Sequence, residues 1–296
     1  MMPKQCPVCC IDSDLVFTTK DWNRKASAQE FEYQKCPRCG LIFLADLPQD
    51  LDHYYGESYY SAPKPERLKK VAEAESYQLA MVRQFVKTGR LLEVGPGFGV
   101  FAYQAKKAGF DVTVIEKEKK CCRFLADHLG VKSIESAAPH TVLESGQGYD
   151  VIALWHVIEH LTFPWEFLKI ASKRLSSNGI LLVATPNPAA FQFKLQGAQW
   201  PHVDAPRHLW LIPLERLVSY LKPLGLEPVM ISFNDKGARS WDRFGWQRYL
   251  MNHFSNKWPQ YIGFILGYCV AKMMGFFDHR NNNGSAYTVI FQKLAA

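Results

Sequence analysis

The chain of 296 residues contains no internal repeat and no low-complexity tract. Hydrophobic residues make up 48% of it and charged residues 21%. This composition favours a packed globular core over disorder. The length allows one large domain with a small second one.

The sequence also lacks an apolar signal core at its N-terminus, Met1 to Cys6. We therefore expect a reducing compartment, in which the eight cysteines bind metals or stay free. The most apolar late stretch is interrupted by Lys272, so its uncharged part is only the 11 residues from Tyr261 to Ala271. That is short for a membrane span. We expect a cytoplasmic protein, with a buried, lid or interfacial helix at 258–277 and peripheral membrane contact there left open.

Clustered charge is a further absence. The net charge is +7, but the lysines and arginines are dispersed rather than grouped among stacking aromatic residues. A moderate positive charge permits nucleic acid, an anionic membrane or a phosphorylated substrate, and selects none of them. Without a basic, aromatic stripe we do not expect a nucleic-acid partner.

What the sequence does contain is a glycine at every second position between Gly95 and Gly99. An apolar run, Leu91 to Val94, leads into these glycines, and a helical pattern follows from Val100 to Ala108. The pattern predicts a strand, a tight turn and a helix, because residues without Cβ atoms let the backbone turn sharply and approach a ligand. The helix N-terminus then presents free N–H groups.

An acidic residue, Glu93, stands at the end of that first strand. The pattern is therefore E-x-G-x-G-x-G rather than the G-x-G-x-x-G of dinucleotide sites. A carboxylate there suits a ligand with a positive group better than a pyrophosphate. The second predicted strand, Phe110 to Glu116, ends in a carboxylate 21 positions after Gly95. Such an acidic residue is expected to bind ribose hydroxyls; a solvated charge opening the next helix is the alternative.

These motifs resemble the class I S-adenosylmethionine-dependent methyltransferases. The resemblance implies a Rossmann-like α/β sheet with helices on both faces and S-adenosylmethionine as cofactor. It places the methionine part near Glu93, Gly95, Gly97, Phe98 and Gly99. It also places the ribose near Glu116 and Lys117, the adenine near 135–137, and the reactive edge near Trp155 and His156.

Four cysteines near the N-terminus form two C-x2-C pairs: Cys6, Cys9, Cys36 and Cys39. Two thiolate pairs complete one tetrahedral metal site, so we predict a zinc ribbon with a structural metal. Disulfides are disfavoured by the expected compartment, and an iron–sulfur cluster is the other option. The remaining four cysteines are expected to be buried or free thiols.

The rest of the sequence predicts domain organisation. We expect the ribbon at 1–50, a tyrosine-rich linker and a leading helix at 51–88, and a methyltransferase domain at 89–296 with a lid insertion at about 188–283. The helix of the linker region is predicted at 66–88. The tyrosines of the linker either pack between domains or fold over the cofactor or substrate.

A second set of polar residues follows the predicted strand Tyr149 to Leu154. The segment 155–161 resembles the corresponding motif of small-molecule methyltransferases, including the ubiquinone-pathway O-methyltransferases. In those enzymes acidic and histidine residues of the motif can hold a divalent cation, although His156 stands here at the first such position. A zinc-protease reading of H-x-x-E-H is disfavoured by the upstream glycine turn. Glu159 and His160 are expected to brace the loop.

The segment 202–210 resembles a D-x-P-R-H segment in a bacterial branch of these methyltransferases, many of which carry an N-terminal C-x2-C ribbon. If the acceptor is a hydroxyl, a base of near-neutral pKa is useful, and histidine fits that role. His208 is the first candidate and His156 the second. A histidine that only pins the lid is the alternative for His208.

We therefore expect S-adenosylmethionine-dependent methylation of a small-molecule or a sugar- or lipid-linked acceptor, by O-methylation with a histidine base. Two other functions stay open. One is an RNA methyltransferase, which a strongly salt-dependent RNA affinity would indicate. The other is a non-catalytic zinc-ribbon interaction protein on a methyltransferase scaffold, which a failure to bind S-adenosylmethionine would indicate.

Overall fold

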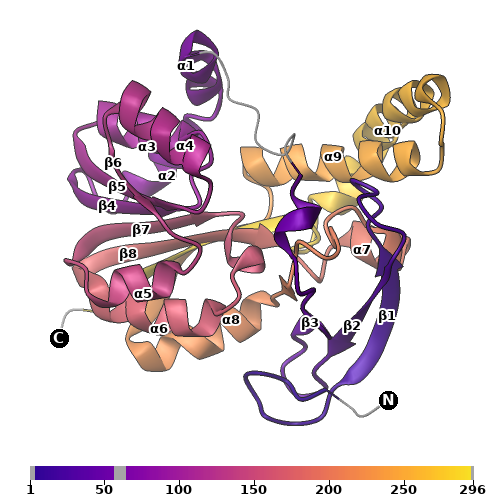
Figure 1. Ribbon diagram of the computed structural model, residues 1–296, viewed down its shortest axis with the longest axis horizontal. Helices are drawn as coiled ribbons and strands as arrows, with labels where there is room; N and C mark the ends of the chain where they lie inside the picture. Colours follow the sequence, from indigo (N-terminus) through magenta and orange to yellow (C-terminus); the bar gives the residue numbers. More distant parts are fainter. Residues whose placement is uncertain (1–3, 57–64, 295–296) are drawn as a thin grey trace. The chain divides into compact units, whose positions relative to one another are not determined.

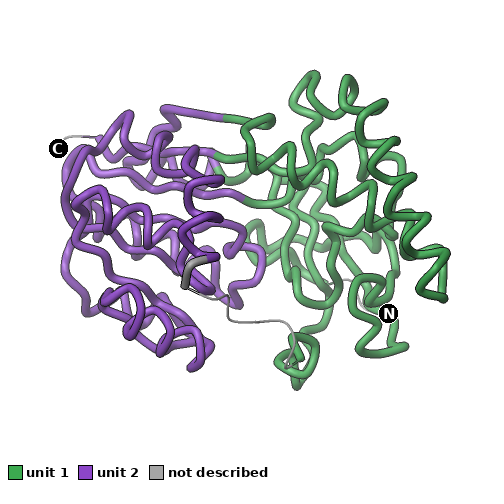
Figure 2. The backbone as a smooth tube through the Cα atoms, turned by 90° about the horizontal axis from the view of Figure 1, so that it is seen from above, with its two compact units in different colours: residues 1–56, 185–217, 232–288 green, residues 57–184, 218–231, 289–296 purple. Residues whose placement is uncertain are grey.

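The computed structural model describes residues 4–56 and 65–294, with side chains of the first helix described from residue 67. The chain forms two compact units, coloured separately in Figure 2. One comprises residues 1–56, 185–217 and 232–288, here called the ribbon unit. The other comprises residues 57–184, 218–231 and 289–296, here called the sheet unit.

A seven-stranded sheet has the order β10-β11-β8-β7-β4-β5-β6. Its strands are β4 (Gly89–Val94), β5 (Phe110–Glu116), β6 (Lys132–Glu135), β7 (Tyr149–Trp155), β8 (Leu175–Pro186), β10 (Leu226–Ser232) and β11 (Ala286–Lys293). The pairs β4–β5, β4–β7, β5–β6 and β7–β8 are all parallel. The predicted α/β fold with a Rossmann-like sheet is confirmed.

Helices connect these strands and cover both faces of the sheet (Figure 1). They are α1 (Pro65–Ala74), α2 (Tyr77–Val82), α3 (Val100–Lys107), α4 (Lys119–Phe124), α5 (Pro139–Glu144), α6 (Pro164–Arg174) and α8 (Leu214–Leu221). In the view of Figure 1, α3 and α4 lie above the strands and α5 and α6 below them. This two-sided cover explains why the central strands are apolar along their whole length.

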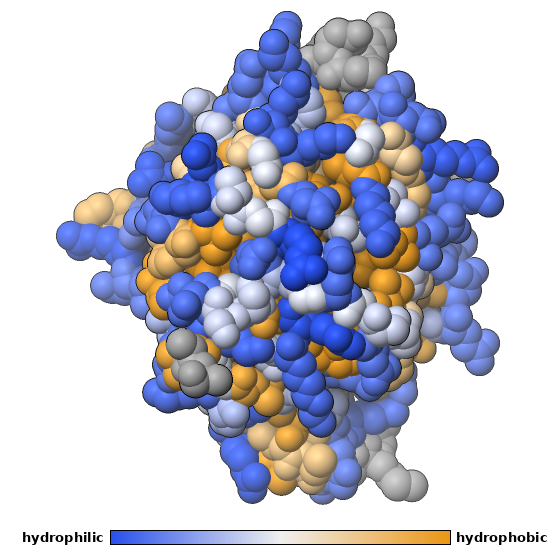
Figure 3. Space-filling model, turned by 90° about the vertical axis from the view of Figure 1, so that its left-hand side faces the viewer, coloured by the Kyte–Doolittle hydropathy of each residue, from blue (hydrophilic) through white to orange (hydrophobic). Residues whose placement is uncertain are grey.

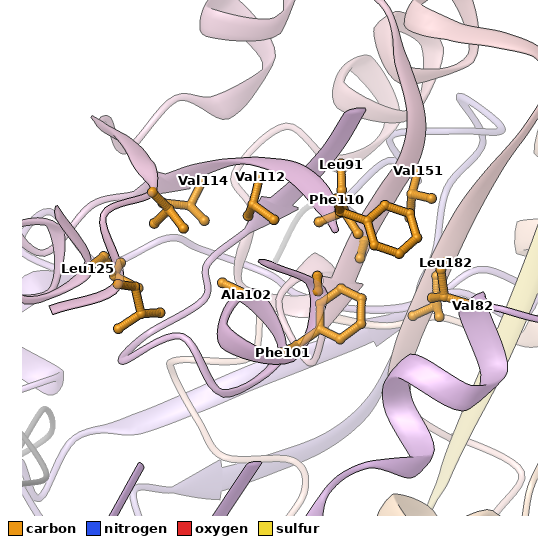
Figure 4. Close-up of a cluster of buried hydrophobic side chains, with 14 of the residues drawn as sticks. Val82, Leu91, Phe101, Ala102, Phe110, Val112, Val114, Leu125, Val151 and Leu182 are labelled. Carbon is orange, nitrogen blue, oxygen red and sulfur yellow. The ribbon is translucent and has the colours of Figure 1, made fainter. Parts of the chain in front are cut away.

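The core of the sheet unit lies between the sheet and the helices of one face. Figure 4 shows Phe101 and Ala102 of α3 against Leu91, Val112 and other strand side chains. Leu91 and Ala102 are fully buried and Phe101 is 1% exposed. Burying such side chains contributes roughly 1.5–3 kcal/mol each for the larger ones. This packing holds α3, and with it the glycine turn before α3, against the ends of the strands.

The single helix predicted at 66–88 is wrong. Two shorter helices, α1 and α2, stand there, separated by turn residues at 75–76. Leu68, Met81 and Val82 still contribute to the same core. The helical character of the segment was predicted, but the turn between the two helices carries no glycine or proline that would have marked it.

The ribbon unit contains a second, smaller sheet of order β1-β2-β3-β9. Its strands are β1 (Asp14–Lys20), β2 (Glu30–Lys35), β3 (Ile42–Leu44) and β9 (Trp210–Leu211), and all its neighbours pair antiparallel. The helices of this unit are α7 (Phe191–Gln196), α9 (Lys236–Asn252) and α10 (Lys257–Asp278). The fourth strand comes from residues that are distant in sequence from the other three.

Short helical turns complete the structure: η1 (Asp52–Tyr54), η2 (Leu125–Leu129, a π-helical turn), η3 (Ile158–His160), η4 (Gly197–Gln199) and η5 (Lys222–Leu224). The segment predicted as a lid, 188–283, is not continuous within one unit, because residues 218–231 belong to the sheet unit. The remainder of that segment shares the ribbon unit with the N-terminal residues. The predicted domain boundaries stay predictions. Tyr59 and Tyr60 of the predicted linker lie outside the described residues.

Candidate functional site

The glycine turn joins β4 to α3 in the sheet unit. Gly95, Gly97 and Gly99 have φ angles of 63°, 56° and 76°, in the left-handed region that favours glycine. The Gly95 N–H donates to the Ile115 carbonyl at 2.8 Å, and the Gly99 N–H donates to Pro96 at 2.9 Å. These bonds fix the turn against β5 and set the start of α3.

The three glycines have different surroundings. A Cβ on Gly95 would lie 2.7 Å from Val157, and one on Gly99 would lie 2.4 Å from Leu125. Both glycines therefore let neighbouring side chains pack close to the turn. A Cβ on Gly97 would have no described atom within 4 Å. The middle of the turn thus faces open space, as a ligand cradle requires.

Glu93 is the most unusual carboxyl group of the site. The residue is 3% exposed, and its Oε2 atom has no hydrogen-bond partner. Burial raises the pKa of Glu93 to about 8, against a hydrogen bond from the Ala102 N–H that lowers it, and nearby Glu116 raises it further. A buried carboxyl with an unsatisfied oxygen and no cation of its own suits a ligand that brings positive charge.

Glu116 stands at the end of β5, beside the same turn. Its carboxylate accepts the Gly97 N–H at 3.0 Å and the Glu118 N–H at 2.9 Å. Burial raises the pKa of Glu116, although these backbone N–H groups act to lower it. A carboxylate has about four lone-pair sites, and the Lys117 N–H also bonds this one, so acceptor capacity is left for another donor. The next residue, Lys117, is partly buried.

Two predicted cofactor residues pack against aromatic neighbours. The Phe98 ring meets Phe124 edge-on at 5.3 Å between centroids. The Trp155 ring, at the end of β7, meets Phe101 at 5.7 Å and Tyr77 at 6.2 Å in the same manner. The buried Nε1 atom of Trp155 has no hydrogen-bond partner. Both rings are thus oriented by the core that supports the turn.

His156 directly follows β7 and has a φ of 56°, which is uncommon for a residue with a side chain. Its N–H donates to Ala184 of the neighbouring β8 at 2.9 Å, which holds this backbone conformation. The side chain is 22% exposed, and its Nδ1 lies 3.7 Å from Oε1 of Glu159, whose side chain is fully buried. A buried carboxylate thus stands next to a half-buried imidazole at the carboxyl end of a parallel strand.

A small, partly open pocket lies near the end of β6. It is lined by the segment after this strand and the segment after η3: Ala137, Ala138, Pro139, His140, Leu161, Thr162, Phe163 and Phe167. Ala137 belongs to the segment that the resemblance assigns to adenine. The lining is mostly apolar with one imidazole, which suits a flat heterocycle.

The four predicted metal ligands meet in the ribbon unit. The sulfur atoms of Cys6, Cys9, Cys36 and Cys39 all lie within 4.8 Å of one another. Cys6 and Cys39 are 3.9 Å apart at their sulfur atoms, and all four cysteines are free thiols. Burial acts to raise the pKa of Cys36, but backbone N–H groups and the neighbouring thiols together lower it to about 7.

The two cysteine pairs have the same local backbone. Residues Cys10 and Gly40 follow the second cysteine of each pair, have φ angles of 52° and 70°, and donate N–H bonds of 2.9 Å to the carbonyls of Cys6 and Cys36. Repetition of this turn around four sulfur atoms is what a tetrahedral metal site requires. The turns also aim backbone N–H groups at sulfur, as between the Cys9 N–H and the Cys6 sulfur at 3.4 Å.

The D-x-P-R-H segment has a structural role that its sequence did not indicate. Arg207 is fully buried, and its guanidinium donates to Asp21 and Asp204 at 2.7 Å each and to the Tyr54 carbonyl at 3.0 Å. The Arg207 guanidinium holds the pKa of Asp204 well below its usual range, against the effect of burial. This cluster joins residues 21, 54 and 204–207 within the ribbon unit.

His208 lies next to this cluster. Its Nδ1 is 2.8 Å from the His202 carbonyl, and its Nε2 is 4.0 Å from Asp204. Its own carbonyl accepts a hydrogen bond from the Tyr33 hydroxyl at 2.7 Å. These contacts are those of a bracing histidine. His208 belongs to the ribbon unit and His156 to the sheet unit, so the two predicted bases belong to different units.

Three features of the sites were not predicted. Val157 packs against Gly95, Asp21 binds Arg207, and Glu159 faces His156. Nothing in the sequence around Asp21 marks it as a partner of a residue 186 positions away. The buried position of Glu159 could have been suspected from its place after a continuous apolar strand.

The comparison with family models identifies one match. The model of the methyltransferase domain matches residues 66–231. Among curated proteins, the ubiquinone biosynthesis O-methyltransferase of Caulobacter vibrioides is 34% identical over 167 residues, which cover 52% of this chain and 66% of that protein. The enzyme of the same name from Bordetella avium is 30% identical and covers 47% and 62%. The chain spans less than two thirds of the length of these relatives.

Solved structures agree on the fold. A methyltransferase dependent on S-adenosylmethionine from Archaeoglobus fulgidus superposes with a TM-score of 0.51 at 17% identity, over 75% of this chain and 94% of that one. The cyclopropane synthase MmaA2 from Mycobacterium tuberculosis has a TM-score of 0.50 at 14% identity, over 74% and 84%. At such low identity the likeness concerns the fold alone, and the two names show that this fold carries more than one reaction.

The glycine turn, the two acidic strand ends and the strand order agree with the matched model, which covers more than half of the chain. The chain belongs to the methyltransferase domain family and has the Rossmann-like fold of class I S-adenosylmethionine-dependent methyltransferases.

Proposed function

We propose that this protein transfers the methyl group of S-adenosylmethionine to a hydroxyl group of a small-molecule or a sugar- or lipid-linked acceptor. The observation that carries the proposal is the buried Oε2 atom of Glu93, which has no partner, at the strand end that leads into a turn with an open middle. A ligand with an ammonium and a sulfonium group would supply the missing positive charge. The name of the curated relatives, O-methyltransferase, supports oxygen as the methylated atom.

The residues of the sheet unit fit the parts of this cofactor. Glu93 and the open turn at Gly97 would receive the methionine part, and the oriented carboxylate of Glu116 would accept the ribose hydroxyls. The apolar pocket beside Ala137 would take the adenine. When bound, S-adenosylmethionine supplies a methyl group on a positively charged sulfur, which leaves as part of a neutral thioether.

The protein's share of the reaction is to position the acceptor in line with the methyl group and to remove its proton. The O–H bond breaks as the new O–C bond forms, and the proton passes to a base. We propose His156 as that base, because it lies in the same unit as the glycine turn and faces the buried carboxylate of Glu159. The carboxylate would orient the imidazole and stabilise its protonated form, as in other histidine–carboxylate pairs.

Calorimetric titration with S-adenosylmethionine and with its demethylated product tests the cofactor assignment. Both ligands are expected to bind, and the Glu116→Ala variant is expected to lose both. The partly exposed carboxylate of Glu227 on β10, which pairs with Lys222, offers a matched control, since Glu227→Ala lies outside the site and should bind normally. A folded protein that binds neither ligand would move the proposal to the non-catalytic scaffold.

Transfer of a labelled methyl group to a panel of phenols, alcohols, amines and thiols tests the reaction. Labelled ethers are expected, and the His156→Gln variant should lose roughly 10²–10⁴-fold in rate while binding S-adenosylmethionine normally. The His208→Gln variant separates the two predicted bases. Loss of rate in that variant alone, with normal folding, would identify His208 as the general base. A panel in which only the amines become labelled would exclude O-methylation.

We also propose that Cys6, Cys9, Cys36 and Cys39 hold one structural zinc ion. Four sulfur ligands fill a tetrahedral shell, so no position is left for a substrate. The repeated turns that end at Cys10 and Gly40 support the proposal, because the cysteines that precede them bring their four sulfur atoms together. Elemental analysis should find one zinc per chain, and Cys36→Ser should lose it. An iron content with visible absorption would indicate a cluster instead, and full occupancy in Cys10→Ser serves as the control.

A further inference from the structure

The helix α10 has an unusual distribution of side chains within the ribbon unit. Its buried residues are Gly263, Gly267 and Asp278. Its large apolar residues are exposed instead: Trp258, Tyr261, Ile262, Phe264, Ile265, Leu266, Tyr268, Met273, Phe276 and Phe277. These ten are nearly half of the 21 large apolar side chains that are exposed among the described residues. A helix of a water-facing surface normally buries its apolar face and exposes its polar one.

The two buried glycines explain how α10 is attached. A Cβ on Gly267 would lie 2.4 Å from the Gln247 Cα atom, and one on Gly263 would lie 3.0 Å from the Leu250 carbonyl oxygen. The helix therefore packs its smallest residues directly on the backbone of α9, and Figure 1 shows the two helices as a pair. The bulky side chains are left on the remaining circumference, as in helices that face lipid.

This exposed apolar surface contrasts with another part of the molecule. The face in Figure 3 is mostly hydrophilic, with apolar residues in small separate patches. Exposed apolar residues scattered singly are normal on any protein, whereas a continuous set on one helix marks an interaction site. On α10, Trp258 is 80% exposed, Met273 75% and Phe276 57%.

The charge of the pair α9–α10 selects the partner. Between residues 236 and 280 the sequence has seven lysines and arginines and two acidic residues. The two acidic residues, Asp242 and Asp278, are both buried. The exposed cations are Lys236, Arg239, Arg243, Lys257, Lys272 and Arg280. No exposed acidic side chain therefore faces outward from this stretch, and the surface is complementary to anionic headgroups.

Two cations lie over aromatic rings of α10, one from the helix itself and one from the residues just after it. The Lys272 ammonium lies 5.6 Å from the centroid of the Tyr268 ring, and the Arg280 guanidinium lies 4.0 Å from that of Phe276. Tryptophan and tyrosine prefer the boundary between headgroups and acyl chains, where one end of the ring is apolar and the other is wet. Lysine and arginine also fit this boundary, because their apolar stems lie along the acyl chains while their charged ends reach the headgroups.

We propose that α10 is an interfacial anchor that binds the surface of an anionic phospholipid bilayer. By length and composition this helix could also cross a membrane, and it is the one such helix within residues 4–56 and 65–294. Its attachment argues against crossing. It packs along α9, which carries Arg239 and Arg243 exposed on its surface and would be drawn into the hydrocarbon with it. If α10 lies in the headgroup region, its apolar face can insert between the lipids while the exposed arginines of α9 stay in water.

Flotation with phospholipid vesicles tests the proposal on the full-length, metal-loaded protein. The probes are vesicles of phosphatidylcholine alone and vesicles that contain about 30% phosphatidylglycerol, which models an anionic leaflet. We expect binding to the anionic vesicles that weakens at high salt. The variant W258Q/I262Q/I265Q should bind roughly 10²–10³-fold more weakly, because each of the three residues loses an insertion contribution worth up to about one tenfold step. The variant K257Q/K272Q/R280Q should lose about fivefold per cation, or about 10²-fold in all, for the same vesicles.

Two controls keep the test decisive. The Leu195→Gln variant changes a residue of the same unit that is 61% exposed but lies on α7, and should bind as the unaltered protein does. Circular dichroism and thermal unfolding should show that all variants fold, since the changed side chains are exposed. Absence of binding to anionic vesicles would overturn the proposal, and so would equal binding to both kinds of vesicle. A dimer that the triple apolar variant disrupts, without vesicle binding, would assign the surface to a second copy instead.

Discussion

Two groups of buried carboxylates in this protein have opposite electrostatic surroundings. In the ribbon unit, Asp21 and Asp204 share the guanidinium of Arg207, and the pKa of Asp204 lies well below its usual range. In the sheet unit, Glu93 and Glu116 stand near one another, and burial raises the pKa of both. Asp21, Glu93 and Glu116 are buried and the Asp204 side chain is 15% exposed, yet only the ribbon-unit group contains its own cation.

The difference separates a structural cluster from a binding site. A buried ion pair with well-placed hydrogen bonds holds segments in place, and removal of one partner leaves an uncompensated charge. A buried carboxyl without a cation is destabilising when ionised unless a ligand supplies the opposite charge. The glycine turn beside Glu93 provides the space for such a ligand, whereas the carboxylates of Asp21 and Asp204 are already balanced by Arg207.

The largest effect is expected for Arg207→Met in the structural cluster. The buried Asp21 and the largely buried Asp204 would lose the guanidinium that they share, and the free energy of unfolding should fall by about 3–5 kcal/mol. Chemical denaturation near neutral pH measures the change. Arg243→Met, which alters an exposed arginine of the same unit, should change it by less than about 0.5 kcal/mol. A loss for Arg207→Met as small as that of the control would show that the cluster does not hold the unit together.

A smaller effect is expected for alanine at two glycines of the turn. Both Gly97→Ala and Gly99→Ala place a side chain at positive φ, which costs about 1–2 kcal/mol. Gly99→Ala also forces its Cβ against Leu125 and should lose roughly 1–3 kcal/mol more. For S-adenosylmethionine affinity we expect the opposite order: Gly97→Ala should lose more affinity than Gly99→Ala, because the ligand would lie at the open side of Gly97. Thermal unfolding and calorimetry together test this, and a larger binding loss in Gly99→Ala would contradict the assignment.

A third prediction concerns the stability of Glu93→Gln as a function of pH. The pKa of Glu93 in the folded protein is about 8, against a value of 4.5 for an unperturbed carboxyl. The folded state therefore holds the extra proton, and its stability falls as the pH rises through this window. Glu93→Gln removes this pH-dependent loss of stability. At pH values above about 8, its free energy of unfolding should therefore exceed that of the unaltered protein by at least about 1.4 kcal/mol, the equivalent of one pKa unit. Identical pH profiles for the two proteins would show that Glu93 is not protonated when buried.

The same variant sharpens the comparison through binding. Glu93→Gln should bind S-adenosylmethionine more weakly although it is the more stable protein, because the neutral amide cannot balance a cation. A matched change in the structural cluster, Asp21→Asn, should weaken folding instead and leave the intrinsic affinity unchanged. Unaltered affinity in a folded Glu93→Gln protein would remove this carboxyl from the cofactor site.

The smallest effect is a proton released on binding. A positively charged ligand favours the ionised form of Glu93 and lowers its pKa, so binding near neutral pH should release up to one proton and the affinity should rise with pH towards about 8. Calorimetry in two buffers with different heats of ionisation counts that proton. Binding without proton release in the unaltered protein would mean that the carboxyl stays neutral beside the ligand.

Much of the sheet unit could be predicted from the sequence because its signals are local. The strand, the alternating glycines and the acidic strand ends occur within 26 residues, from Leu91 to Glu116. The cysteine pairs were equally readable, since ligand spacing within each pair is set by one turn of backbone. The break between α1 and α2 was missed, because no residue in it has a strong turn preference.

Other features arose only from contacts between distant residues. Arg207 lies within the predicted lid insertion, yet its partners include residues at positions 21 and 54. The strand β9 joins the N-terminal sheet from residues 210–211. The apolar stretch at 258–277 suited a buried helix as well as an exposed one, and only its glycine contacts with α9 decide which side faces outward.

The sequence by itself determined the parallel sheet, the glycine turn with its two carboxylates and the four sulfur ligands, because each depends on residues a few positions apart. The tertiary structure decided which carboxylates have a cation, which glycine of the turn faces open space and which side of α10 is exposed. Those properties depend on what lies across a packed interface, and burial and charge pairing are set by neighbours in space rather than in the chain.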